Sequence, residues 1–461
     1  MAIYPHWGVR DIDVRRRRVY GGCDRPTLRG DRTVVRINRE RLWADLMRLK
    51  EIGGYDDDAT GLRGVRRLAL TDEDAEARRL VVSWMREAGL AVRVDRIGNV
   101  YAERAGTEPS LPCVLMGSHI DTVATGGAFD GTLGVLGGIE VMRSLNEAGI
   151  RTRRPIEVGF FTEEEGVRFG TDMLGSAVTA GRLTLEYAHN LTDATGATVQ
   201  GELVRIGFDG PTPEIRPIPH AYIECHIEQG PILAEAGVDV GIVTGVQAIS
   251  WQRLTVRGEA AHAGTTPIAA RHDAGLAAAE VVVEVRRMCD SGHFGQLRGT
   301  VGNFAVRPAQ TNVIPAEAVL TVDLRNPDDA LMTKAEKHLA GFVDDLRRRH
   351  GVTATWERMA KTAMVPFHES IQEVIAASAD RLGLRYVRAM SGAGHDAQEI
   401  AATCPTAMVF VAGEYGGISH TPREYSRPDA CGNGIDILAN AVLTLAEPIT
   451  EGGPVTQVAP Q

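Results

Sequence analysis

The sequence predicts an α/β protein with two domains. The larger would hold a mostly parallel, doubly wound sheet, and the smaller would be inserted into it. Short apolar runs alternate with amphipathic helical stretches over the first half of the chain, as in βαβ units. After about Gln247 the order becomes βαββαβ, and after about Thr362 the earlier pattern returns. We therefore expect residues 35–246 and 362–461 to form the large domain and residues 247–361 the inserted one.

Helical periodicity predicts two helices between Asn38 and Gly89, the second with Thr71 as its N-cap and acidic residues in its first turn. A strand-like stretch over 91–104 follows. The rest of the large domain alternates strands with helices in the order strand 111–120, helix 134–149, strand 155–161, strand 221–227, helix 369–383 and strand 406–413.

The inserted domain is predicted to be a ferredoxin-like α+β unit, with four antiparallel strands under two helices. Its elements are expected in the order strand 251–258, helix 270–288, strands 300–308 and 316–326, helix 329–351 and strand 353–360.

Composition excludes several classes of protein. The 461 residues include 50 Lys and Arg against 60 Asp and Glu, a net charge of −10, which argues against a nucleic-acid-binding body. No apolar run approaches the ~20 residues needed to cross a bilayer. The six cysteines show no CxxC pairing and indicate reduced, mostly buried thiols; they are Cys23, Cys113, Cys225, Cys289, Cys404 and Cys431. We therefore expect a cytoplasmic protein without nucleic-acid or membrane partners.

The first 34 residues differ from the rest of the chain in their charge and in their lack of a hydrophobic pattern. They contain eight arginines, including Arg15–Arg18, and four aspartates, with no apolar periodicity. Because they lack the apolar core of a secretory signal, we expect a basic, loosely ordered extension without an assigned function.

Histidine and carboxylate side chains lie at the ends of four predicted strands of the large domain or in the loops that follow them. His119 and Asp121 end the first strand, with Asp130 nine residues beyond Asp121. The second strand ends in Glu163, Glu164 and Glu165, the third in His226, and a glycine-rich loop after the fourth contains His420. Taken singly, each histidine fits an ordinary hydrogen-bonded role and the three glutamates fit a solvated turn. Because the carboxyl ends of parallel strands meet in one crevice, their recurrence instead indicates a nitrogen and oxygen site suited to zinc, manganese or cobalt.

Eight motifs resemble those of the hydantoinase/carbamoylase-type amidohydrolases. This group contains N-carbamoyl-L-amino-acid hydrolases, β-ureidopropionases and allantoate amidohydrolases, within the two-metal aminoacylase–carboxypeptidase clan. The resemblance covers about Asn38 to Leu445, and the motifs occur in family order. They read SHIDTV, GGAFDGTLGVLGGIE, FTEEEGVRFG, HIEQGPILAEAG, AAHAGTTPIAARHDA, QTNVIPAEAVLTVDLR, GAGHDAQEIA and GGISHTPRE.

The resemblance implies two divalent metal ions per subunit, either zinc, or manganese or cobalt. His119 and His226 would bind one metal, Glu165 and His420 the other, and Asp130 would bridge them. Glu164 would be the catalytic base. Asp121 would accept the second imidazole N–H of His119 and fix its tautomer, while Glu163, as a solvated or capping side chain, has no assigned role.

The resemblance also assigns substrate contacts. His262, as an oxyanion donor, and Asn312 and Arg325 would reach the active site of a partner subunit, in a homodimer joined through the inserted lid domain. The planar fork of Arg325 suits a substrate carboxylate. Three further residues would line the same cleft, namely Gln229, Gly394 and His395.

The implied activity is metal-dependent hydrolysis of the carbamoyl amide bond of N-carbamoyl-L-amino acids, giving the amino acid, CO2 and NH3. A β-ureidopropionase or an allantoate amidohydrolase remains an alternative. A peptidase or N-acyl amino acid deacylase of the clan is less favoured, because such relatives commonly carry Asp or Glu where this chain has His226. A catalytically inactive scaffold is disfavoured because every expected ligand and the base are present.

Overall fold

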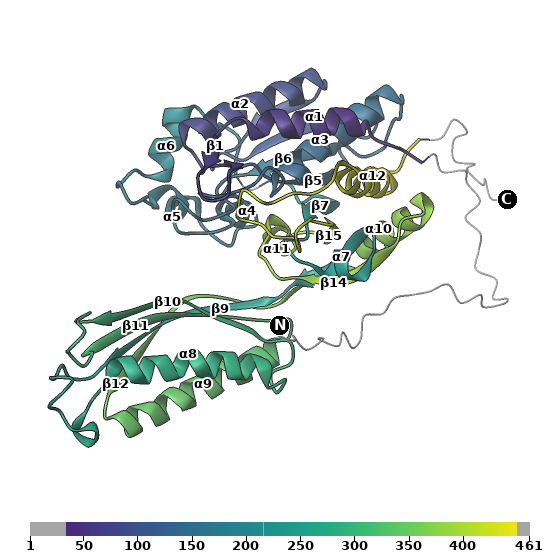
Figure 1. The fold of residues 1–461 in the computed structure, drawn as a ribbon. Coiled ribbons are helices and arrows are strands. Elements are labelled where there is room, and N and C mark those ends of the chain that lie inside the picture. Colours follow the sequence, from purple (N-terminus) through teal and green to yellow (C-terminus); the bar gives the residue numbers. More distant parts are fainter. Residues whose placement is uncertain (1–33, 215, 450–461) are drawn as a thin grey trace, which may run out of the picture. The chain divides into compact units, whose positions relative to one another are not determined.

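The computed structural model describes residues 34–214 and 216–449, which form two compact units (Figure 1). One unit runs to Thr244 and resumes at Phe367, and the other is Gly245–Pro366. All but the last residue of the expected basic extension lie outside the described residues. None of the described helices is both long and apolar enough to cross a membrane.

Four parallel strands form the centre of the sheet in the large unit. They are β5 (Val114–His119), β6 (Ile156–Phe161), β7 (Ala221–Ile227) and β15 (Thr406–Val411), in the spatial order β15-β7-β5-β6. Every residue of these strands is buried, as expected of parallel strands covered by helices on both faces. These are the four strands whose carboxyl ends carry the motif residues.

The complete sheet is mixed, so the expectation of a mostly parallel sheet is wrong for its flanks. On one side, β4 (Val100–Arg104) is antiparallel to β6 and to β3 (Ala91–Val94). On the other side, β8 (Val240–Val246) is antiparallel to β15 and to β13 (Val365–Pro366) and pairs with β14 (Tyr386–Ser391).

The reversal between β3 and β4 explains part of this difference. The segment expected as one strand bends back at a tight turn, where the Asp95 carboxylate accepts hydrogen bonds from the main-chain N–H groups of Ile97 and Asn99. A parallel pairing would need a crossover of about a dozen residues or more, which this turn does not provide.

Helices cover both faces of the central strands. Helices α3 (Thr132–Glu147) and α12 (Pro428–Leu445) pack on each other and on β5 and β7, and α1 (Arg39–Lys50) packs on both helices. Helices α4 (Leu174–Thr179) and α11 (Asp396–Ile400) pack on each other and contact β6 and β7, respectively.

The remaining elements of this unit complete the layers. They are α2 (Asp72–Glu87), α5 (Leu185–Asn190), α6 (Val199–Ile206), α7 (Ile232–Ala236), α10 (Glu369–Leu382) and a hairpin of β1 (Gly54–Asp57) and β2 (Leu62–Val65). The Thr71 side chain accepts a hydrogen bond from the main-chain N–H of Asp74, which confirms the predicted N-cap of α2.

The smaller unit has the βαββαβ order. It consists of β9 (Ala248–Arg257), α8 (Ala274–Asp290), β10 (Arg298–Arg307), β11 (Glu317–Asn326), α9 (Asp329–His350) and β12 (Thr353–Thr362), with a short 3₁₀ turn at Ile268–Ala270. The sheet order is β10-β11-β9-β12, and each pair of neighbouring strands is antiparallel. Figure 1 shows α8 and α9 on one face, where alternate strand residues such as Leu254 and Leu320 are buried.

Candidate metal centre

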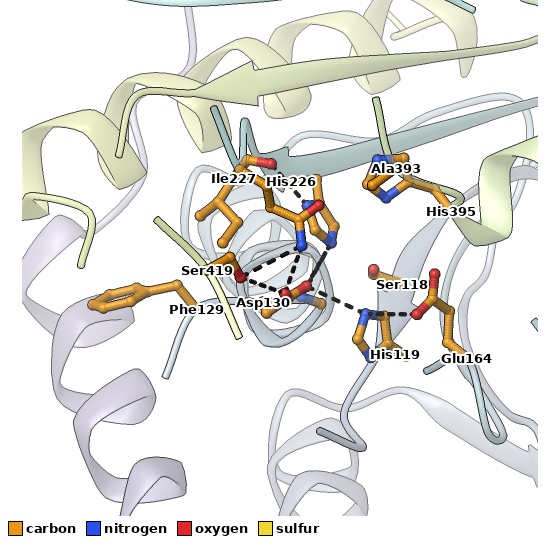
Figure 2. Close-up of polar contacts among 12 residues, drawn as sticks. Ser118, His119, Phe129, Asp130, Glu164, His226, Ile227, Ala393, His395 and Ser419 are labelled. Atoms are coloured by element: carbon orange, nitrogen blue, oxygen red, sulfur yellow. Dashed lines mark hydrogen bonds and ion pairs between the residues drawn. The ribbon is translucent and has the colours of Figure 1, made fainter. Parts of the chain in front are cut away.

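Five histidine and carboxylate side chains meet at the carboxyl ends of the central strands. Figure 2 shows the Asp130 carboxylate between Ser419 and the imidazoles of His119 and His226. Besides a triplet of Glu224, His226 and His395, the possible ligand atoms form two triplets that contain Asp130, each within 4.8 Å: His119, Asp130 and His226, and Asp130, Glu165 and His420. Asp130 belongs to both triplets, so its carboxylate can bridge two positions.

The two buried histidines have their ring orientation fixed by main-chain carbonyl groups. Nδ1 of His119 lies 3.0 Å from the carbonyl oxygen of Asp121, and Nδ1 of His226 lies 2.9 Å from that of Ile227. Because a carbonyl oxygen only accepts, each Nδ1 carries the proton and each Nε2 has a free lone pair. These Nε2 atoms lie 3.7 Å and 3.1 Å from Oδ1 of Asp130, and both imidazoles are therefore oriented as metal ligands.

The close approach of chain segments at this point requires glycine at position 131. Gly131 has φ +64, and a Cβ atom there would lie 2.3 Å from Nε2 of His119. Its N–H instead donates to Nε2 of His226 at 3.2 Å, which agrees with an unprotonated Nε2.

The Asp121 side chain has a different partner from the one expected. Its Oδ1 lies 3.8 Å from Nδ1 of His119, beyond hydrogen-bond distance, and the carbonyl oxygen of Asp121 accepts the hydrogen bond from Nδ1–H instead. The carboxylate accepts hydrogen bonds from the main-chain N–H groups of Glu164 and Glu165, at 3.4 and 3.3 Å. Asp121 thus orients the turn that carries these two glutamates.

The second triplet contains more exposed groups. Nε2 of His420 lies 3.4 Å from Oδ2 of Asp130 and 3.4 Å from Oε2 of Glu165, and half of the His420 side chain is exposed. Each oxygen of the Asp130 carboxylate therefore faces a different set of ligands, since Oδ1 faces His119 and His226.

Buried negative charge makes the arrangement fit divalent cations. Burial and the neighbouring Asp130 raise the pKa of Glu165 to about 8, and Oε1 of Glu165 is buried without a hydrogen-bond partner. Burial alone would raise the pKa of Asp130, but contacts with His119, His226 and His420 hold it well below its usual range. Imidazole nitrogens and carboxylate oxygens suit zinc, manganese or cobalt, and a cation would supply the partner that Glu165 lacks.

Glu164 lies beside the triplets without belonging to either. Its Oε2 is 3.5 Å from Nε2 of His119. Burial raises the pKa of Glu164 well above its usual range; the charges of Asp396, Glu165 and Asp130 add to this, while His119 opposes it. This carboxyl group is therefore placed to hold a proton next to the ligands.

Glu163 is buried, so the expected solvated alternative is wrong and the capping alternative is confirmed. It adopts φ +56, and its carboxylate accepts hydrogen bonds from the main-chain N–H groups of Arg168 and Phe169 at 2.9 and 2.7 Å. This holds the loop that follows the three glutamates.

Two of the three residues expected to line the cleft, Gln229 and His395, contact the candidate ligands. Nε2 of Gln229 donates to Oδ2 of Asp130 at 2.7 Å. The His395 ring meets that of His226 edge-on, with centroids 4.4 Å apart, as Figure 2 illustrates. A Cβ atom at Gly394 would lie 3.2 Å from Cε of Met173, so this position is closely packed.

In the smaller unit, His262 and Asn312 lie on adjacent segments. Nδ1 of His262 accepts from the N–H groups of Gly264 and Thr265 at 3.0 and 3.1 Å, so the proton of the neutral ring is on Nε2. The N–H of Ala263 donates to the carbonyl oxygen of Asn312 at 3.0 Å. His262 therefore presents an N–H donor.

Arg325 lies near the opposite end of the same sheet. The segment at Asn312 precedes the start of β11 at Glu317, whereas Arg325 is eight residues further along the strand, about 27 Å at the usual rise. Its guanidinium pairs with Asp323, with Nη2 to Oδ2 at 3.0 Å. The structure thus does not bring Arg325 together with His262 and Asn312 in one copy of the chain, because the strand separates them.

Residues 115–444 match peptidase family M20/M25/M40. The chain belongs to this family. It is 40% identical over 412 residues to the N-carbamoyl-L-amino-acid amidohydrolase of Rhizobium meliloti, covering 89% of this chain and 97% of that protein. A ureidoglycolate hydrolase of Arabidopsis thaliana is 34% identical over 409 residues, covering 87% and 85%.

A solved structure of an amidase of the hydantoinase/carbamoylase family from Burkholderia multivorans is also similar. It superimposes with a TM-score of 0.83 and 42% sequence identity, covering 89% of this chain and 98% of that chain. The resemblance stated from the motifs is therefore confirmed, as is the expectation of a hydrolase that acts on amide bonds.

Two residues of this M20-family chain contact Asp130 and were missed by the sequence-based prediction. Oγ of Ser419 lies 2.8 Å from Oδ2 of Asp130, and the Glu424 carboxylate accepts from the main-chain N–H of Asp130 at 3.1 Å. Both belong to the GGISHTPRE motif, but their position next to His420 gives no sign of a contact with Asp130, 289 and 294 residues away.

Proposed function

We propose that the chain hydrolyses the carbamoyl amide bond of N-carbamoyl-L-amino acids, releasing the amino acid, CO2 and NH3. The observation that carries this proposal is the pair of ligand triplets that share Asp130, with the buried Glu164 carboxyl beside them. The similarity to the N-carbamoyl-L-amino-acid amidohydrolase of Rhizobium meliloti supports the substrate class.

His119 and His226 would hold one cation, Glu165 and His420 a second, and Asp130 would bridge them. Two divalent cations bound there, zinc, manganese or cobalt, would polarise the carbamoyl carbonyl and lower the pKa of a water molecule. Asp121 would hold Glu164 and Glu165 in place through their main-chain N–H groups.

Glu164 would transfer the proton. Its carboxylate would take a proton from the attacking water as the oxygen bonds to the carbamoyl carbon. The bond between that carbon and the amino-acid nitrogen then breaks, and Glu164 returns the proton to the departing nitrogen. The other product, carbamate, decomposes to CO2 and NH3. The Nε2–H of His262 would stabilise the developing oxyanion, since its Nδ1 is occupied by two N–H donors.

Substrate contacts would come from two copies of the chain in a homodimer formed through the lid domain. A carbamoyl amino acid spans on the order of 10 Å or less, so it cannot reach both His262 and Arg325 of one copy. We therefore place His262 and Asn312 in one subunit and Arg325 in the other at each site. Gln229, Gly394 and His395 would line the cleft, and Arg325 would bind the substrate carboxylate.

The test is release of ammonia and free amino acid from a panel of ureido acids by enzyme reconstituted with zinc, manganese or cobalt. Carbamoyl-L-α-amino acids should be the best substrates, and N-acetyl amino acids and dipeptides should be poor ones. Carbamoyl-β-alanine, ureidoglycolate or allantoate cleaved at least ~10-fold better than every carbamoyl-L-α-amino acid, about 1.4 kcal/mol, would overturn the substrate assignment and leave the metal centre intact.

A further inference from the structure

A second buried carboxylate, Glu424, lies behind the bridging carboxylate of Asp130. Its Oε1 accepts hydrogen bonds from the main-chain N–H groups of Phe129 and Asp130, at 2.9 and 3.1 Å. Its Oε2 accepts from Oγ of Ser419 at 2.6 Å. Glu424 is 6% exposed, and the three hydrogen-bond partners of its carboxylate lie in the two loops that carry Asp130 and His420.

The two loops are packed tightly against each other at this carboxylate. A Cβ atom at Gly127 would lie 2.4 Å from Oε1 and 2.5 Å from Cβ of Glu424, so no side chain fits there. In addition, Oγ1 of Thr125 donates to the carbonyl oxygen of His420 at 3.1 Å. Glu424 therefore ties the loop after β5 to the loop after β15.

The contacts of Glu424 reach the triplet that contains His420 more directly than the triplet that contains His119 and His226. Ser419 contacts Oδ2 of Asp130, the oxygen that faces His420, at 2.8 Å. His420 itself is adjacent to Ser419 on the loop and adopts φ +59. By contrast, His119 and His226 are fixed by carbonyl groups next to their own strands, independently of Glu424.

We propose that Glu424 is a positioning residue for the cation held by Asp130, Glu165 and His420, and that it has little effect on the cation held by His119 and His226. This inference rests on the two-cation centre proposed above. The Glu424 carboxylate sets the place of the Asp130 main chain and, through Ser419, the direction of Oδ2. Groups that orient ligands in this way commonly change metal affinity by about 10–100-fold when removed.

The experiment measures stepwise Co2+ binding to metal-free enzyme, by visible absorption and by competition with a chromophoric chelator. A His420→Ala variant identifies the step that belongs to the second triplet. Glu424→Ala should weaken that step by about 10-fold or more and leave the other within about 3-fold. Glu424→Gln should stay within about 3-fold of wild type at both steps, because its amide oxygen accepts the same N–H groups and its nitrogen can donate to Ser419.

Two further variants complete the design. Ser419→Ala removes the hydroxyl between Glu424 and Oδ2 of Asp130 but keeps the hydrogen bonds of Glu424 to the main chain. It should weaken the same step, so it tests the positioning role even if Glu424→Ala does not fold. Glu414→Ala is the matched control, since this carboxylate on the same loop pairs with Arg427 and should leave both steps unchanged.

Equal weakening of both steps, or no weakening by Glu424→Ala and Ser419→Ala, would overturn the positioning role while the centre stands. A wild-type protein that binds only one Co2+ would contradict the two-cation centre and this role together. Selective loss of the second step, restored by Glu424→Gln, would establish it.

Discussion

Oε2 of Glu164 lies 3.5 Å from Nε2 of His119, and both side chains are buried. The two atoms face each other although Glu164 follows β6 and His119 ends β5, because these strands are parallel neighbours whose carboxyl ends coincide. A carboxyl group held this close to the ligands, but outside both triplets, is suited to proton transfer.

Glu164→Gln should therefore lower kcat by about 10²–10⁴-fold or more, because the amide retains the shape of the side chain but cannot accept a proton. Metal content, measured by elemental analysis, should remain close to wild type. Glu165→Gln is the matched variant and should lose metal instead. If Glu164→Gln loses as much metal as Glu165→Gln, the roles assigned to the two residues are wrong.

Removal of divalent cations should abolish turnover and lower the thermal unfolding midpoint. Without cations, burial and Asp130 disfavour the charged form of Glu165, whose Oε1 is buried without a hydrogen-bond partner. A cation that binds only the folded chain stabilises it. Zinc, manganese or cobalt should restore both properties. Asp130→Ala should weaken both cation sites and His226→Ala one of them. Full activity in rigorously metal-free protein would contradict the proposed chemistry.

The separation of His262 from Arg325 along the sheet predicts an unequal result in subunit-mixing experiments. Inactive Glu164→Gln protein is mixed with inactive His262→Ala protein or, separately, with inactive Arg325→Ala protein, under conditions of demonstrated subunit exchange. Activity should return in only one mixture, the one whose second residue is supplied by the partner. Rescue in both mixtures would contradict the separation, and rescue in neither would place every residue in its own subunit's site.

Arg325 should determine the requirement for a substrate carboxylate. Loss of one partner of a desolvated charge pair costs about 2–5 kcal/mol, so amides or esters of carbamoyl amino acids should lose roughly 30-fold or more in kcat/KM. Arg325→Lys should restore only part of the activity lost in Arg325→Ala, because an ammonium group lacks the planar fork. Equal rates with free acids and amides would exclude this role.

Asp436 on α12 should hold the segment of residues 36–39 in place. Its buried carboxylate accepts from the main-chain N–H of Ile37 at 2.9 Å and from the guanidinium groups of Arg36 and Arg39 at 2.8 and 2.7 Å. Asp436→Ala should cost about 1–3 kcal/mol and lower the unfolding midpoint. Asp429→Ala, on the same helix but 92% exposed and 3.5 Å from Arg39, should have almost no effect. Equal midpoints for both variants would refute this anchor.

Local patterns in the sequence were sufficient to predict the strands and helices that carry the candidate metal ligands. An apolar run that ends in His119 or His226 predicts a buried strand followed by polar groups. Thr71 is predicted as an N-cap because it precedes an acidic first turn. The pairing of ligands into two triplets followed from the resemblance, and two of the three groups of possible ligands in the described residues have this membership; the third group, Glu224, His226 and His395, was not predicted.

Other features depended on how distant segments meet. The hairpin of β3 and β4, the carbonyl rather than carboxylate partner of His119, and the contacts of Glu424 and Ser419 with the loop of Asp130 were not predicted. Periodicity and capping are properties of neighbouring residues, so a sequence displays them directly. A hydrogen bond between residues nearly 300 positions apart depends on strand order and loop path, and only the tertiary structure decides these.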